Sequence, residues 1–243
     1  MWISLVIFLS VWEVIALLLQ SAFLPEPIGV FKTAVSLFAK PQIYGHILAS
    51  LKRTIIGFLL AVVVASSLAY ILGLNEKIKN YVNPILELLR PIPPLAWIPL
   101  AILWFGIGDG SSYFIIFIAA FFPILTNVYF GVKSIPTNYK RVRHNYLLSK
   151  IQYFTHVVVP FTTPYLLAGC KTGIGIAWMA VVAAEIISAN SGLGYFIETS
   201  RVLLRTEEVI IGMIIIGLLG FLIHHFIVLI EKRLTSWRYE KHD

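Results

Sequence analysis

Few groups in the apolar stretches of this 243-residue chain can do chemistry, and Glu185 is foremost among them. It lies in a run, residues 172–197, that is otherwise free of charged side chains. An unpaired carboxylate near the middle of a bilayer costs about 2.5–3.5 kcal/mol, so such a group faces a bundle interior, water or a partner of opposite charge. Two interpretations follow: Glu185 lines or gates a solute pathway near its outer end, or it forms a structural pair, for example with Arg53.

Other reactive residue types lack the spacing that their chemistry needs. His224 and His225 are adjacent, so their side chains diverge by about 100° on a helix and cannot form an i, i+4 metal-ligand pair; we expect a packed or interface role for them. Lys133 and Ser134 resemble the end of a phosphate-binding loop, but the glycine spacing of that motif is missing. Cys170 is the only cysteine, which excludes a disulfide-stapled fold. We expect no metal site, no bound cofactor and no ATP hydrolysis by this chain alone.

The composition indicates what holds these residues in place. Hydrophobic residues make up 58% of the chain, charged residues 13%, and the mean hydropathy is +0.85. A soluble domain is about half apolar and about a quarter charged, so this chain is neither a soluble globule nor disordered. The formal charge of +7 lies between apolar runs, which favours headgroup contacts over nucleic-acid binding. We expect an all-α integral membrane protein, because helices satisfy their backbone polar groups internally.

Six stretches are long enough to cross about 30 Å of hydrocarbon, which takes about 20 helical residues. We therefore expect a polytopic protein with about six transmembrane helices, at residues 1–24, 54–74, 91–108, 110–132, 172–197 and 209–230. With the N-terminus inside, 13 of the 19 Lys and Arg residues fall on the cytoplasmic side and the other 6 outside. The positive-inside rule then predicts that both termini are cytoplasmic.

The largest polar insert, residues 133–171, lies on the predicted cytoplasmic side. Residues 137–148 are predicted to form a short basic helix, and Ser149 with Gln152 fits the capping box that starts a second helix. That second helix should end before Pro160, because the residue preceding a proline avoids the helical region. Such a hairpin either binds headgroups or docks a soluble partner.

Two shorter segments are expected outside the membrane. Residues 28–40 have apolar side chains at helical spacing after two prolines, which predicts a short helix lying on the outer interface. Residues 188–206 are expected to form an outer loop that contains a Ser-Gly-Leu-Gly sequence.

Three stretches make the chain recognisable. They are residues 93–100 (PPLAWIPL) with 104–108 (WFGIG), residues 131–169 with their Val159-Pro160 and Pro164, and residues 175–195, which run from Gly-Ile-Ala-Trp through Ala184-Glu185 to Ser-Gly-Leu-Gly-Tyr. With these motifs the chain resembles the membrane-spanning permease subunits of binding-protein-dependent ABC importers, and more narrowly the nitrate/sulfonate/taurine branch. The resemblance implies a type I ABC importer permease fold with a single transmembrane permease domain, residues 1–243, a core at 46–231 and a cytoplasmic coupling hairpin at 133–165.

The resemblance also implies a function and partners. Such a permease translocates a small solute, for example nitrate, a sulfonate, taurine, bicarbonate or a thiamine precursor, that an extracytoplasmic binding protein delivers. The implied partners are a second permease copy in a homodimer, two ATP-binding subunits that hold ATP and Mg, and the lipid bilayer of a bacterial or archaeal plasma membrane. The alternative is an ATP-independent secondary transporter or channel, a class that favours internal repeats and paired broken helices.

The hairpin contains the implied ATPase-coupling residues, which are Tyr139, Arg141, Val142, Arg143, Tyr146, Leu147 and Pro160. The family's Glu-Ala-Ala triplet aligns with residues 141–143, and its glycine aligns with Leu147. Because a left-handed turn would strain a leucine, we expect the turn at Leu147 to take another geometry. Replacing Arg143 with Glu is expected to weaken ATPase docking.

The candidate pathway or gate residues are Trp97, Trp104, Trp178 and Glu185. The three tryptophans either line a pathway or pack within the bundle. The prolines of residues 91–99 break the start of the third span, and broken helices occur where they line a cavity or pack against protein. A carboxylate would repel an anionic solute, which favours a gate or a structural partner over a substrate ligand for Glu185.

Overall fold

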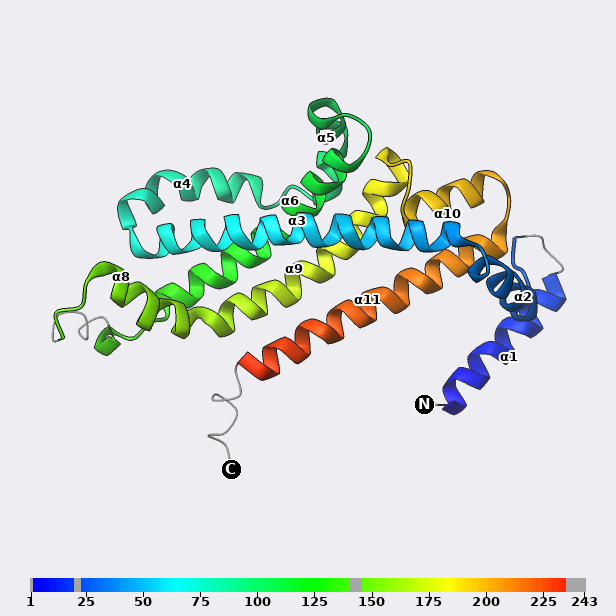
Figure 1. Ribbon diagram of the computed structural model, residues 1–243, viewed down its shortest axis with the longest axis horizontal. Coiled ribbons are helices and arrows are strands. Elements are labelled where there is room, and N and C mark those ends of the chain that lie inside the picture. The colour runs from blue at the N-terminus through cyan, green and yellow to red at the C-terminus, as the bar shows by residue number, and fades with distance from the viewer. Residues whose placement is uncertain (1, 20–22, 140–145, 235–243) are drawn as a thin grey trace.

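The computed structural model describes residues 2–19, 23–139 and 146–234. Throughout these ranges the regular elements are helices, which confirms the all-α fold (Figure 1). Four helices are long and apolar enough to cross a membrane: α3 (Pro41–Leu74), α6 (Asp109–Lys133), α8 joined to α9 (Lys150–Ser188) and α11 (Thr206–Leu234). The expected count of about six is reached only if two further elements are included. One is a pair of helices bent at a break, which forms a broken span or a re-entrant loop, and the other is the shorter apolar helix α1 (Trp2–Leu19).

The centre of the bundle is the packing of α6 against α3 on one side and α9 on the other. Small residues permit this close approach. Ala61, Ala65 and Ala69 recur at every fourth position of α3 and are fully buried. Gly57 precedes them by one turn, and a side chain there would come within 2.7 Å of Cβ of Ile116 on α6. The α3 and α6 backbones therefore approach one another at a distance that larger side chains would prevent.

The helices α1 and α11 lie at the periphery. Only 6% of the most apolar stretch of α11 is buried inside the bundle, and α1 contacts mainly α2 (Pro27–Phe38). Their exposed apolar side chains suit hydrocarbon rather than water. The helix α2 confirms the short helix predicted at residues 28–40, and it packs on α3 and α11.

The third expected span is not one helix. Residues 91–108 form the 3₁₀ turn η1 (Pro94–Trp97) and the short helix α5 (Ile98–Phe105), whose eight residues reach about 12 Å and cannot cross a bilayer. They follow α4 (Glu76–Leu89), which the sequence did not predict, and the two parts are bent by 91°. Prolines lack the N–H group and fix φ, which explains the break. The break that these prolines predicted is therefore present, but residues 91–108 do not form a single spanning helix.

The fifth span also differs from the prediction. Ser149 and Gln152 form the predicted capping box, but the helix that follows does not end before Pro160. It continues through a π turn, η2 (Phe154–Val158), into α9 (Val159–Ser188). A π turn contains an extra residue, which gives the proline ring room and keeps the helix continuous. The second helix of the predicted hairpin is therefore the beginning of a spanning helix.

The helix α9 ends at Ser188, earlier than the expected end at residue 197. Gly192 has a φ of +107°, and the chain then enters α10 (Leu193–Val202). The segment at 188–206, expected to be a loop, thus contains a helix that packs on α9 and α11. Figure 1 places α2 and α10 at one end of the molecule and α8 at the other.

Candidate functional site

A buried cluster of charged side chains joins α3, α6 and α9. Arg53 of α3 is 3% exposed, and its Nη1 lies 2.8 Å from Oε1 of Glu185 on α9, which is fully buried. Nε of Arg53 donates to Oδ1 of Asp109, the first residue of α6, over 2.7 Å. The structural pair of Arg53 with Glu185, one of the two interpretations of the sequence, is therefore present in the fold.

Both carboxylate oxygens of Glu185 are hydrogen-bonded. Oγ of Ser50 lies 2.8 Å from each of them, and the N–H of Gly194 donates to Oε2 over 2.9 Å. Arg53 also donates to the carbonyl oxygen of Ser191 over 2.6 Å and to its Oγ over 2.7 Å. A buried ion pair is tolerated when its remaining hydrogen-bonding groups are satisfied, as they are here. In this conformation the Glu185 carboxylate is enclosed and does not contact a passing solute.

The Ser-Gly-Leu-Gly turn closes over this carboxylate. The N–H of Leu193 donates to Oγ of Ser50 over 2.8 Å, and the N–H of Gly192 donates to Nδ1 of His46 over 3.1 Å. A Cβ on Gly192 would overlap the Glu185 carboxylate, and its positive φ also disfavours other residues. Two independent constraints therefore require glycine at this position, and the turn ties α10 to α3 and α9.

The helix that contains the second predicted span begins earlier than that span. The charges of Lys52 and Arg53 suggested a start at residue 54, whereas α3 begins at Pro41. Because Asp109 and Glu185 neutralise Arg53 inside the bundle, its charge does not mark the end of the membrane-spanning helix.

Sequence reasoning missed two members of the cluster, Ser50 and Asp109. Asp109 directly follows Gly108, and the turn that separates α5 from α6 contains Gly106 and Gly108 with φ values of +74° and +134°. That turn signal was present in the sequence. Ser50 precedes Arg53 by three positions on α3, so the helical spacing that brings the two to one face was its only signal.

The three candidate pathway tryptophans lie in two places. Trp178 is 6% exposed, and its Nε1 donates to the carbonyl oxygen of Ile216 over 3.0 Å, so it packs between α9 and α11. Trp97 and Trp104 meet around Phe114 of α6, with ring centroids 6.2 and 5.7 Å from its ring. Trp104 is 55% exposed, and Nε1 of the half-buried Trp97 has no hydrogen-bond partner among the described residues. The structure thus brings Trp97 and Trp104 together and places Trp178 in a different interface.

The described coupling residues lie on the surface. Tyr146 and Leu147 are 74% and 91% exposed, and the Tyr139 ring lies 5.9 Å from that of Phe161. Pro160 lies in the first turn of α9. The remaining coupling residues, Arg141, Val142 and Arg143, fall outside the described residues.

Leu147 adopts the left-handed conformation, with a φ of +52°. The expectation that this turn would take another geometry is therefore wrong. Because the side chain is almost fully exposed, only the local clash of its Cβ with the backbone opposes the conformation, at a cost of about 1–2 kcal/mol. The segment retains the turn that a glycine would give, and it presents a leucine side chain to a partner.

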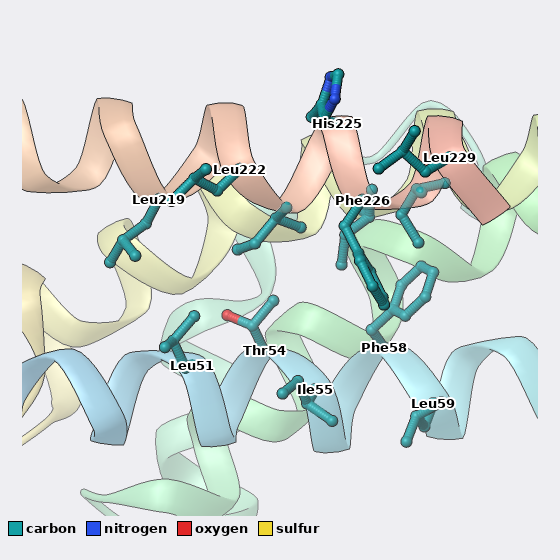
Figure 2. Close-up of a pocket in the computed structure, with 13 residues that line it drawn as sticks. Leu51, Thr54, Ile55, Phe58, Leu59, Leu219, Leu222, His225, Phe226 and Leu229 are labelled. Atoms are coloured by element: carbon teal, nitrogen blue, oxygen red, sulfur yellow. The ribbon is translucent and has the colours of Figure 1, made fainter.

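A cavity of about 590 Å³ lies between α3 and α11. Figure 2 shows the apolar side chains of the two helices facing each other across it. Thr54 and His225 are the polar members of the lining; His225 is exposed and points away from α3 (Figure 2), and its ring stacks on the exposed Phe221 with centroids 6.0 Å apart. Such a groove suits a hydrocarbon chain rather than a small polar solute. Within the described ranges, no three His, Cys, Asp or Glu side chains are placed to hold a metal ion.

Comparisons with known proteins define the family of this chain. The family described as "Binding-protein-dependent transport system inner membrane component" matches residues 57–236. The chain belongs to this family. The permease is accordingly an integral membrane protein of a transport system.

Several relatives cover nearly the whole permease. It is 40% identical to a Methanocaldococcus jannaschii protein named as an ABC transporter permease, over 94% of the chain and 88% of that protein. It is 32% identical to the taurine transport system permease protein TauC of Escherichia coli, over 98% of the chain and 89% of TauC. It is 33% identical to the nitrate import permease protein NrtB of Synechocystis, over 95% of the chain and 86% of NrtB.

A solved structure of the MetNI methionine ABC transporter, titled as inward facing conformations, shares the fold. The TM-score is 0.70 at 18% identity, and the match covers 80% of the permease and 96% of that chain. This likeness supports the type I importer permease fold. Family and relatives together make the permease the membrane-spanning subunit of an ATP-driven ABC importer, a class that works with ATPase and substrate-binding partners. They favour this function over an ATP-independent transporter or channel.

Proposed function

We propose that the permease carries a small solute with an oxyanion group, such as nitrate, taurine or an aliphatic sulfonate. The observation behind this proposal is the similarity to a taurine and a nitrate permease over 98% and 95% of the chain. An extracytoplasmic binding protein delivers the solute, and two ATP-binding subunits hold ATP and Mg and hydrolyse the nucleotide. The permease itself contributes no cofactor and no ATPase activity.

The proposal includes an arrangement of the chain in the membrane. Residues 1–243 form a single transmembrane domain with its core at 46–231, and residues 133–165 form the cytoplasmic coupling hairpin. Both termini lie in the cytoplasm of a bacterial or archaeal cell, as the distribution of Lys and Arg supports. A second, identical copy completes the translocation path.

A continuous helix supports the proposed coupling. The helix from Lys150 to Ser188 contains 39 residues, about 58 Å, and joins the exposed hairpin to the buried cluster at Glu185. A movement that an ATPase imposes on the hairpin therefore reaches the cluster without passing through a flexible joint. In this mechanism the ion pair of Arg53 with Glu185 holds the ends of α3 and α9 together in one transport state.

Transport by the reconstituted complex tests the proposal. The permease, its ATPase and its binding protein are placed in vesicles, and uptake of labelled nitrate, taurine and methanesulfonate is measured with and without ATP. We expect ATP-dependent uptake of at least one of them, together with ATPase activity that the loaded binding protein stimulates. Uptake that continues without ATP, or a permease that does not co-purify with an ATPase, would contradict the proposal.

A further inference from the structure

We infer that Arg90 forms an oxyanion-binding site on the translocation path, an inference that rests on the proposed transport of such solutes. The site is a cavity of about 410 Å³ between α6, α9 and the end of α4. Its polar lining consists of Arg90, Thr126, Asn127 and Thr172, and its described lining contains no acidic side chain. The helices α6 and α9 are also the most closely packed pair of the bundle, so the cavity lies against its centre.

The charge of Arg90 is not neutralised by a neighbour. Arg53, Arg201 and Arg205 each pair with a carboxylate. Arg90 makes no ion pair within the described part of the chain; its Nη2 donates instead to Oγ1 of Thr126, a neutral group, over 2.8 Å. A guanidinium has five N–H donors, and Arg90 is exposed and lines the cavity, so donors beyond the one used for Thr126 are accessible to a ligand there.

Arg90 lies deeper than a cytoplasmic loop. It directly follows α4, whose 14 residues reach about 21 Å back along α3 from the turn at Asn75 (Figure 1). The sequence placed Arg90 among the inside loop residues, whereas the fold places its guanidinium beside Thr126, seven residues or about 10 Å before the end of α6 at Lys133. An arginine at such a depth must face water or meet an anion, because burying an isolated charge in hydrocarbon is costly.

The polar wall of this cavity is accessible. Arg90 and Thr172 both line the cavity, and both are exposed, so a solute can reach them. The cavity therefore offers an accessible positive charge, which an ionic solute requires and a lipid tail does not.

The geometry suits a planar or tetrahedral oxyanion. The guanidinium fork can donate two parallel hydrogen bonds to the oxygens of a nitrate or a sulfonate. Asn127 on α6 and Thr172 on α9 also line the cavity; each already donates to a backbone carbonyl, over 2.9 Å to Pro123 and 3.2 Å to Ala168, so they add their remaining hydrogen-bonding capacity beside the guanidinium. A single arginine without a second charge holds the solute only weakly, which is what passage along a path requires.

Charge-selective labelling of one cysteine tests the site without depending on transport. Thr172→Cys is introduced with Cys170→Ala, so that the reporter is the only thiol of the permease in the reconstituted complex. Two methanethiosulfonates are compared, an anionic one carrying a sulfonate and a cationic one carrying trimethylammonium, and each rate is divided by the rate of the same reagent with free cysteine. We expect the anionic reagent to react about tenfold faster, which corresponds to about 1.4 kcal/mol. Sodium methanesulfonate should slow the anionic reagent more than sodium chloride does.

Matched variants decide whether Arg90 is responsible. Arg90→Gln should abolish the preference, Arg90→Lys should keep part of it, and Arg201→Gln, which removes the same charge from the exposed α10, should keep all of it. A preference that survives Arg90→Gln would overturn the site. If Arg90→Gln also removed the stimulation of the ATPase, Arg90 would serve coupling, and the assignment would again be wrong.

Two further measurements separate the alternatives. Labelling of the permease with Arg90 and with Arg90→Gln is compared in phosphatidylcholine vesicles and after phosphatidylglycerol is added, because the negative surface of the added lipid slows the anionic reagent for both proteins. If the difference between the two proteins disappears with the added lipid, a headgroup and not a free solute occupies the site, which would overturn the inference. If nitrate, taurine and methanesulfonate are not taken up but the Arg90-dependent preference persists, the anion site stands and the proposed function fails. If uptake occurs and Arg90→Gln changes neither uptake nor labelling, the function stands and the site fails.

Discussion

Glu185 and Arg53 neutralise each other inside the bundle, and each would be an unpaired buried charge without the other. Asp109 also contacts Arg53, but its side chain is 51% exposed, so water screens its charge. The pair with Glu185 is therefore the contact whose loss the protein tolerates least.

Glu185→Gln tests the importance of this ion pair, because it replaces one carboxylate oxygen with an NH₂ group. The amide removes the charge and places an NH₂ group among the N–H of Gly194, the guanidinium of Arg53 and the hydroxyl of Ser50, which all donate to the carboxylate now. We expect the free energy of unfolding to fall by about 3 kcal/mol, measured by thermal unfolding of the purified permease. Uptake by the reconstituted complex should also fall.

The control is Glu198→Gln, which breaks an exposed pair with Arg201 and should have little effect. A Glu185→Gln variant with normal stability and normal transport would refute both the structural and the gating role of this carboxylate.

Replacing Leu147 with glycine is expected to stabilise the turn and to weaken binding of the ATPase. Leu147→Gly removes the cost of the left-handed conformation, and we expect slower hydrogen exchange of the amides near residues 146–149. It also removes a side chain that is 91% exposed, so ATPase co-purification should fall. Leu147→Val, which is β-branched and tolerates this conformation less, should speed the exchange. Equal exchange in all three proteins would show that the turn is not left-handed in solution.

Among the elements, the hairpin is the predicted contact with the ATPase. Arg143 falls outside the described residues, and its role is a prediction from the sequence alone. Arg143→Glu reverses a charge where the family has a Glu-Ala-Ala triplet, and we expect weaker ATPase docking, measured as the amount of ATPase that co-purifies. Arg201→Glu on α10, at the other end of the molecule, is the control. Unchanged co-purification and unchanged transport would contradict the prediction.

Elements with local signals were predictable from the sequence, and elements that depend on packing were not. The capping box at Ser149 and the proline-started α2 follow from side chains a few residues apart, and both are present. The π turn at Phe154–Val158 carries no local signal, because it depends on how the helix continues past Pro160. The start of α3 could not be predicted from the local sequence for a similar reason, because the partners that neutralise Arg53 lie on α6 and α9.

For the site, sequence reasoning identified Glu185 and a partner in Arg53 because a carboxylate in an apolar run requires explanation. It did not identify Arg90 as special, because positive charges were assigned to loops by their position in the sequence. Only the direction of α4, which runs back along α3, places Arg90 beside Thr126. That direction depends on tertiary packing after the turn at Asn75.

For the whole molecule, the orientation in the membrane is the property that needs a direct measurement. With Cys170→Ala as background, Lys40→Cys lies before α3 and Lys77→Cys at the start of α4, at opposite ends of α3. We expect a membrane-impermeant maleimide to label Lys40→Cys in intact cells, and Lys77→Cys only after the membrane is opened. The reverse pattern would contradict cytoplasmic termini.

Gly169 is a point about which the long helix from Lys150 to Ser188 can tilt. It lies midway between the two ends, and a Cβ there would come within 3.0 Å of Cα of Ile124 on α6, so the backbones nearly touch at this point. A helix that is held at its middle moves at both ends when it tilts. A tilt of about 10° moves each end, about 28 Å from Gly169, by about 5 Å, and the two ends move in opposite directions. A push on the hairpin would thus move Glu185, about 24 Å from Gly169, by about 4 Å in the opposite direction, so the two faces of the membrane would move in opposite senses.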